Sequence, residues 1–294
     1  MTNTKSRINF AFLGLAALTA GCASTRTAVP AGYANGVKTV DTPNLIFSSS
    51  GNGLLLDSAG NPTGTGAVQV TYQETSDPDV VIATVSGQEF KLTWDGAKGL
   101  FYGTSADGSA EMALLPYTAG YSADSQVSMG YAYIGFADGT HGATYYAAGL
   151  KTDPVQMAAL TGTATYAGYA NLAIGHGTSN VSFGDGSLAL AADFGAGTVS
   201  GSMTVSDSGS DPGFTIAPNT VITIDPATIS GNGFNGTWSV ANPANLALTS
   251  VGTTGLQGSF YGVNAADVGG SFNGTGVSAD GVTPAYIFGG FMGQ

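Results

Sequence analysis

The chain has 294 residues, with 46 Gly, 7 Lys and Arg, and 19 Asp and Glu. So few charges exclude a coiled coil or a helical bundle, because these need long stretches rich in Ala, Glu, Lys, Leu and Arg. A hydrophobic content of 43%, with 13 Tyr and 14 Phe, is enough to bury a core, so a disordered chain is disfavoured too.

The start of the chain has the pattern of a bacterial lipoprotein signal. Lys5 and Arg7 form a short positive region, and residues 10–18 form an apolar core of roughly half the ~20 residues that span a bilayer. Small residues then lead into Cys22 in the order Leu-Thr-Ala-Gly-Cys. This resembles a lipobox, in which a lipid is attached to the thiol and the chain is cut before the Cys, although Thr19 stands where Leu is usual.

These residues predict a signal peptide over 1–21, lipid attachment including palmitate at Cys22, and a flexible tether over 22–40. An ordinary signal peptide followed by a stray Cys is the alternative. Ala23, and not Asp, follows the Cys, which favours the outer membrane of a Gram-negative bacterium. An orientation toward the cell surface is expected, and a periplasmic orientation is left open.

Charge and cysteine content exclude several classes of partner. Without Lys5 and Arg7 the chain keeps 5 basic and 19 acidic residues, a net charge of −14. Such a polyanion repels phosphate backbones, so nucleic acid is not expected as a partner. Contact with the membrane is expected through the lipid alone. A single Cys excludes a disulfide within the chain and a Cys-based metal site.

The second half of the chain repeats a five-residue pattern: a large apolar residue, any residue, Gly, any residue, and a second apolar residue. Strand side chains alternate between faces, so each Gly shares a face with its bulky neighbours and the opposite face is polar. Small residues on the inner face suit the taper and coiling of a small closed barrel. The pattern occurs at 166–170, 199–203, 234–238, 256–260 and 268–272.

Turn residues divide the segment from Thr163 onward into nine candidate strands. We expect an all-β fold with an eight-stranded antiparallel barrel over 158–294, one of the nine candidates being short or an edge. Residues 41–157 predict a smaller β-rich, handle-like subdomain. Within it, 129–136 is apolar on both faces and is expected to be a strand buried between layers.

Residues 260–272 read Phe-Tyr-Gly-Val-Asn-Ala-Ala-Asp-Val-Gly-Gly-Ser-Phe, and 287–290 read Ile-Phe-Gly-Gly. This phrase resembles the penultimate hairpin and closing strand of the transferrin-binding-protein-B-like surface lipoproteins, and the resemblance extends over about 160–294. It implies a handle domain followed by an eight-stranded barrel on a lipid-anchored surface protein that captures a protein or haem. True transferrin receptors have two lobes and Lys-rich loops, so we expect a single-lobed relative.

Ligand contact is expected outside the barrel, because large side chains should fill its interior. Tyr145, Tyr146 and Tyr121 are the candidate ligand-binding residues, since tyrosine is enriched at binding hot spots. The loops Ser206–Pro218 and Ala241–Thr253 are the longest in the barrel, and the first is polar and expected to be mobile. The residues expected to fill the interior are Tyr166, Met203, Phe234, Trp238, Phe260 and Phe272.

Catalytic and metal chemistry is not expected. His141 and His176 lie in Gly-flanked turns, where exposed imidazoles are expected, and they lack the close spacing of a metal site. The Asp-Gly pairs at 107–108 and 185–186 predict turns and not calcium loops. No carboxylate pair or nucleophile elbow stands out, so we expect no enzyme. Haem, held by a histidine or by one of the tyrosines, is the single cofactor left open.

The sequence therefore predicts a binding lipoprotein at the outer membrane or cell surface, without catalysis, whose ligand is a protein or a haem-related molecule. The alternative is a structural surface-coat or adhesion lipoprotein without a defined ligand.

Overall fold

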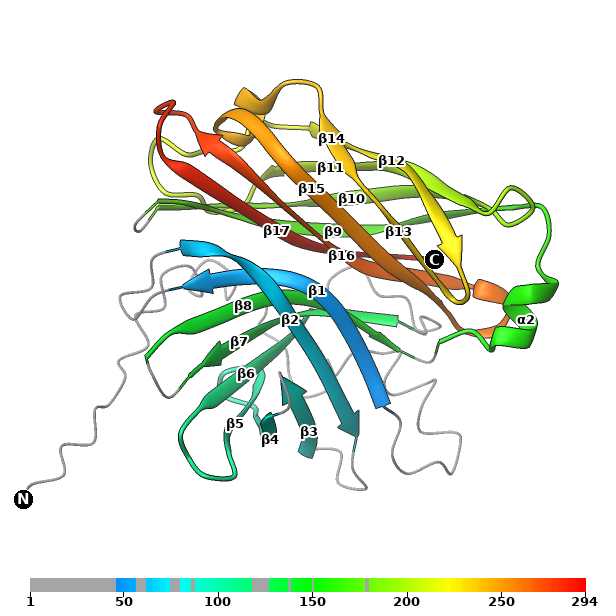
Figure 1. The fold of residues 1–294 in the computed structure, drawn as a ribbon, viewed down its shortest axis with the longest axis horizontal. Helices are drawn as coiled ribbons and strands as arrows, with labels where there is room; N and C mark the ends of the chain where they lie inside the picture. The colour runs from blue at the N-terminus through cyan, green and yellow to red at the C-terminus, as the bar shows by residue number, and fades with distance from the viewer. Residues whose placement is uncertain are drawn as a thin grey trace, which may run out of the picture.

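The computed structural model describes residues 46–56, 62–74, 80–85, 88–117, 127–136, 139–149, 151–177 and 180–294. They form two antiparallel β-barrels that lie against each other, the first below the second in Figure 1. The expected signal peptide, the lipid attachment at Cys22, the tether over 22–40 and Tyr121 lie outside the described residues, so these expectations stay predictions.

Eight strands close the first barrel in chain order, because the last strand pairs with the first. The expected β-rich subdomain is thus confirmed, and its closure is a feature that the strand pattern does not reveal. Its strands are β1 (Ile46–Leu56), β2 (Pro62–Glu74), β3 (Val80–Val85), β4 (Gln88–Asp95), β5 (Leu100–Ser105), β6 (Glu111–Tyr117), β7 (Val127–Gly135) and β8 (His141–Gly149).

A short helix, α2 (Pro154–Ala159), joins the two barrels (Figure 1). Asp153 caps it by accepting hydrogen bonds from the backbone N–H of Val155 at 2.8 Å and of Gln156 at 3.4 Å, and Pro154 occupies its first turn. These are ordinary helix-start signals, but six residues are too few for a helical period to appear in the sequence. Among the residues that the structure describes, no helix has the length and apolarity needed to cross a bilayer.

The second barrel is also closed. Its sheet runs in the order β11-β10-β9-β17-β16-β15-β13-β12, and β12 pairs back to β11. β13 and β14 occupy one strand position, since both pair with β12. The expected eight-stranded antiparallel barrel is therefore confirmed. Its strands are β9 (Thr163–His176), β10 (Asn180–Asp193), β11 (Thr198–Asp207), β12 (Thr220–Ser230), β13 (Gly233–Gly236), β14 (Trp238–Val240), β15 (Leu248–Tyr261), β16 (Asp267–Ser278) and β17 (Pro284–Gly293), with the 3-10 turns η4 (Pro243–Leu246) and η5 (Val263–Ala265).

Two of the nine candidate strands are one strand in the structure. The prediction of a turn at Asp185-Gly186 is wrong, because β10 runs through both residues without a break. Gly186 lets β10 lie close to β11 at this point, because a Cβ there would lie 1.9 Å from the carbonyl oxygen of Thr204 on β11. The other described pair, Asp107-Gly108, does form a turn.

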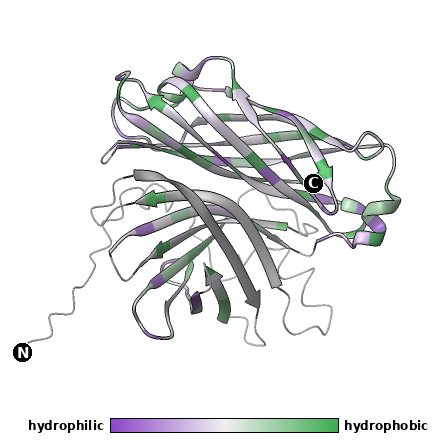
Figure 2. Ribbon diagram, viewed as in Figure 1, coloured by the Kyte–Doolittle hydropathy of each residue, from purple (hydrophilic) through white to green (hydrophobic). Residues whose placement is uncertain are grey.

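The repeated Gly pattern points its large residues into the second barrel, as expected. Phe234, Trp238 and Phe260 are among the largest fully buried side chains. Gly258 leaves room for a ring, because a Cβ there would lie 2.3 Å from the Phe234 side chain. The six residues expected to fill the interior are all at most 4% exposed. Figure 2 shows hydrophobic and hydrophilic residues interleaved along these strands.

Candidate binding surface at the seam between the barrels

The seam between the barrels is built from β1, β7 and β8 on one side and β9, β15, β16 and β17 on the other. On β7, Ala132 and Ile134 belong to the core of the first barrel, while Met129 and Tyr131 pack in a separate cluster with the second barrel. The expectation that 129–136 lies between layers is confirmed, because each face of this strand meets a different barrel. The buried seam cluster consists of Val127, Met129, Ala143, Tyr145, Ala147, Ala173, Tyr261, Phe288 and Met292.

Tyr145 lies at the centre of the seam and is 1% exposed. Its hydroxyl donates a hydrogen bond to the Oδ1 of Asn171 on β9, and its ring meets Tyr131 at 5.5 Å and Phe288 at 5.5 Å between centroids. Tyr145 therefore joins the two barrels through both a polar and an aromatic contact.

Tyr146 points the opposite way, into the core of the first barrel, and is 4% exposed. Gly130 makes room for it, because a Cβ there would lie 2.3 Å from the Tyr146 hydroxyl. The expectation that Tyr145 and Tyr146 form an exposed contact surface is wrong, since consecutive residues of a strand with a layer on each side are both covered.

Other aromatic residues at the edge of the seam are half-buried. Five of them come from both barrels and pack against the seam cluster, whereas Tyr102 lies two strands from Tyr133 in the register Tyr102–Ala113–Tyr133. The aromatic chemistry expected near Tyr145 therefore exists, but on different residues. We call this set the tyrosine surface: Tyr102, Tyr131, Tyr133, Tyr169, Phe183 and Tyr286. The alternation of Tyr131 and Tyr133 with the small or aliphatic residues between them is the sequence signal that points to it.

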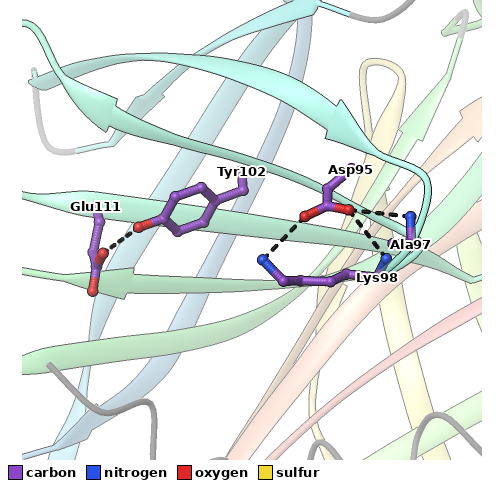
Figure 3. Close-up of polar contacts among 5 residues, drawn as sticks. All are labelled: Asp95, Ala97, Lys98, Tyr102 and Glu111. Atoms are coloured by element: carbon purple, nitrogen blue, oxygen red, sulfur yellow. Dashed lines mark hydrogen bonds and ion pairs between the residues drawn. The ribbon is translucent and has the colours of Figure 1, made fainter. Parts of the chain in front are cut away.

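Carboxylates accept hydrogen bonds from this surface. The Tyr102 hydroxyl donates to Glu111 on β6 (Figure 3), and burial with this bond raises the pKa of Tyr102 to about 12. Burial, with the nearby Glu111 charge, also raises the pKa of Tyr133 to about 12. Across the seam, the Tyr169 hydroxyl donates to Asp185 at 3.1 Å. The phenols of Tyr102 and Tyr133 are therefore neutral at pH 7 and act through hydrogen bonding and ring contact.

A cation stands at the outer end of the tyrosine surface. Lys98 Nζ lies 3.0 Å from Asp95 Oδ2 and 5.8 Å from the Tyr102 ring centroid. Figure 3 shows Asp95 also accepting from the backbone N–H of Ala97 and Lys98, so it closes the β4–β5 turn. These contacts, the Lys98 hydrogen bond first, lower the pKa of Asp95.

The expectation of exposed histidines is wrong at both positions. His176 is 2% exposed, with its ring nitrogens 3.0 Å from Ser278 Oγ and 2.8 Å from Ser182 Oγ, and burial lowers its pKa to about 4. His141 is 7% exposed and stacks on Tyr133 at 5.4 Å. Their flanking glycines lie in or beside strands, so they mark strand ends and not solvated loops. Within the described residues, no cluster of three or more His, Asp, Glu or Cys is placed to hold a metal.

The two long loops of the second barrel are tied down. In the Ser206–Pro218 loop, Asp211 exchanges hydrogen bonds with the backbone of Val181, and Phe214 packs its ring 4.5 Å from His176. The Ala241–Thr253 segment holds η4 and the start of β15. Both loops thus form part of the barrel wall or its rim.

The phrase at 260–272 forms the end of β15, the turn η5 and the start of β16. Gly262, Asn264 and Ala265 all have positive φ in this turn. The Tyr166 hydroxyl donates a hydrogen bond to the Ala265 carbonyl at 2.7 Å, and Thr152 Oγ1 donates to the Gly262 carbonyl at 2.8 Å. The phrase therefore encodes a left-handed turn at the end of the barrel beside α2.

One known family matches the second barrel. Residues 159–290 match the family described as the C-lobe and N-lobe beta barrels of Tf-binding protein B. A search of curated proteins found no significant match.

Three solved structures are similar at low identity. Transferrin Binding Protein B from Haemophilus parasuis is 12% identical with a TM-score of 0.42, over 86% of this chain and 77% of that chain. HpuA from Kingella denitrificans, in complex with human haemoglobin, is 12% identical with a TM-score of 0.38, over 87% and 88%. Transferrin binding protein B from Neisseria meningitidis is 13% identical with a TM-score of 0.37, over 86% and 77%.

The family match covers the second barrel and includes the quoted hairpin phrase, and it confirms the resemblance seen in the sequence. Residues 159–290 of this chain are therefore similar to the β-barrels that form the lobes of Tf-binding protein B.

Proposed function

We propose that this chain is a lipid-anchored binding protein of the outer-membrane surface that captures a protein ligand on the tyrosine surface, without catalysis. One observation carries the proposal: five half-buried aromatic residues from both barrels pack against the buried seam cluster, and Tyr102 extends this surface on the first barrel. Tyrosine offers a large contact area and a hydrogen-bonding tip at low cost in conformational entropy, which is why it is frequent at binding hot spots. The match of the second barrel to the lobe barrels of Tf-binding protein B supports the same class of function.

The proposed ligand contact lies on the tyrosine surface and not on the long loops of the second barrel. The Ser206–Pro218 loop offers Phe214 as its single aromatic residue, and that ring packs on His176. The tyrosine surface is therefore the stronger candidate for a protein interface. A surface-coat or adhesion role remains the alternative, and it requires no specific ligand.

Thermal denaturation with defined probes separates the two. Human haemoglobin, transferrin and free haem would each be added to the purified full-length protein, with haem also followed by its Soret band. A probe that binds only the folded state raises the melting temperature by mass action. No shift and no capture by any probe would favour the structural alternative.

The anchor has its own test. Cys22→Ala should move the protein from the membrane fraction to the soluble fraction, because Cys22 is the one thiol available for lipid attachment. Fractionation with a high-pH wash measures this, and a Cys22→Ala protein that still pellets with membranes contradicts the anchor. The release is expected whether or not the tyrosine surface binds a ligand.

A further inference from the structure

A polar cleft of about 340 Å³ opens between the outer face of the second barrel and the end of the first. It uses β13, β15 and β16, and so differs from the tyrosine surface, whose second-barrel residues lie on β9, β10 and β17. The floor of the cleft is formed by side chains that the strand register places in neighbouring rows. Asn235, Gln257 and Ser271 lie side by side across three strands, and Ser259 lies in the next row between Gly233 and Gly269.

Lys151 stands at the other end of this floor. Its backbone pairs with Tyr261, two residues along β15 from Ser259, and its side chain lines the cleft. No Lys or Arg follows Lys151 in the sequence, while 152–294 contains eight Asp. In the described part of the chain, Lys151 has no carboxylate within ion-pair distance, and desolvation alone lowers its pKa. Lys151 is an exposed residue at the edge of the cleft, so its ammonium is accessible to an anionic ligand there.

Asn232 adds an unsatisfied acceptor beside Lys151. Its Nδ2 donates to the carbonyl oxygen of Thr152, the neighbour of Lys151, at 2.6 Å. This bond fixes the amide, and its Oδ1 is buried with no hydrogen-bond donor among the described residues. A buried acceptor without a donor is unusual in a folded protein, and a ligand hydroxyl or a water bridged to one would satisfy it.

We propose that this cleft binds a small hydroxylated carboxylate with the chemistry of a sugar acid. The carboxylate pairs with the Lys151 ammonium, and the hydroxyl groups exchange hydrogen bonds with Asn232, Ser259 and the row formed by Asn235, Gln257 and Ser271. From residue 257 to residue 261 a strand advances about 14 Å, which suits a ligand of one or two sugar units. Side chains that both donate and accept favour hydroxyl groups over an anion alone.

Equilibrium dialysis of the purified full-length protein tests the proposal with four probes: glucuronate, glucose, acetate and inorganic phosphate. Glucuronate should bind at least about tenfold more tightly than each of the others, since none of the others combines the carboxylate with the hydroxyl groups. Phosphate binding as tight as glucuronate binding, equal binding of glucose, or no glucuronate binding would each overturn the assignment.

Matched variants locate the site. Lys151→Met should weaken glucuronate binding at least about tenfold, and Lys151→Arg should retain it. Lys98→Met is the control, because Lys98 is paired with Asp95 on the first barrel, far along the chain from the cleft. Thermal melting of each variant verifies folding. Unchanged glucuronate binding by a folded Lys151→Met protein, or an equal loss with Lys98→Met, would contradict the site.

Discussion

The two barrels have the same number of strands but cover their outer faces differently. In the first, the outer face of β7 and β8 is apolar and aromatic, because it packs on the other barrel. In the second, the outer face of most strands is polar, and glycines on the inner face make room for large rings. A strand that is apolar on both faces therefore marks a seam, and a strand with Gly among bulky residues marks a filled, closed barrel.

The largest effect should come from breaking the seam. Tyr145→Ala removes a ring that is 1% exposed and contacts Tyr131, Phe288 and Asn171. Truncation of a buried aromatic residue costs about 3–5 kcal/mol, so the free energy of unfolding should fall by that much. Chemical denaturation measures it. Tyr146→Ala, at the next position, should destabilise the first barrel while leaving the Asn171 contact intact. A Tyr145→Ala protein as stable as wild type would mean that the barrels do not depend on this contact.

A smaller effect should come from the interior of the second barrel. Gly258→Leu places a side chain against the Phe234 ring, and overpacking of this kind costs about 1–3 kcal/mol. Ser200→Leu, on the exposed face of β11, is the matched control and should cost much less. Thermal and urea denaturation of the two variants compare the faces. Equal destabilisation would contradict the assignment of inward and outward sides.

The stability of the second barrel should depend on pH because His176 is buried. Its pKa is about 4 when folded, against about 6.5 when unfolded, so the unfolded chain takes up the proton first as pH falls. The stability that neutral His176 contributes is fully present above pH 6.5. It is lost on acidification toward pH 4, and this loss is at most about 3 kcal/mol.

His176→Gln isolates this contribution from that of the carboxylates, among which Asp211 and Asp280 act on the ring. Urea denaturation at pH 7 and pH 4.5 should show a smaller loss of stability in the variant than in wild type. Parallel losses in the two proteins would show that His176 does not carry this dependence.

Local patterns explain which parts of this fold follow from the sequence. The five Gly-centred repeats predict the second barrel and its inward residues, because alternation and turn spacing act within one strand and its neighbours. Closure of the first barrel depends on the pairing of Leu54–Leu56 with residues 141–143, about 85 residues away, and no local pattern reports it. Asp185-Gly186 has the composition of a turn, but close approach to β11 decides its structure.

The candidate site was harder to predict than the fold for the same reason. The tyrosine content indicates an aromatic binding surface, but strand alternation alone does not say whether a second layer covers a given face. Tyr145 is buried by β17 and β9, which follow it in the chain, whereas Tyr131 and Tyr133 are half-buried at the edge of the same seam. The exposure of each ring is therefore a property of how the two barrels pack.

The central claim is that one binding surface is built from both barrels, and paired substitutions test it most directly. Tyr131→Ala on the first barrel and Tyr286→Ala on the second would be compared with Ser200→Ala, using surface plasmon resonance with the probe that shifts the melting temperature of wild type. Loss of a hot-spot tyrosine costs more than about 1 kcal/mol, so each tyrosine variant should raise the Kd at least about fivefold when it is measured at a temperature where its melting curve shows it folded. Ser200→Ala should bind like wild type. A protein in which only one of the two tyrosines matters, or in which neither does, would contradict a shared surface.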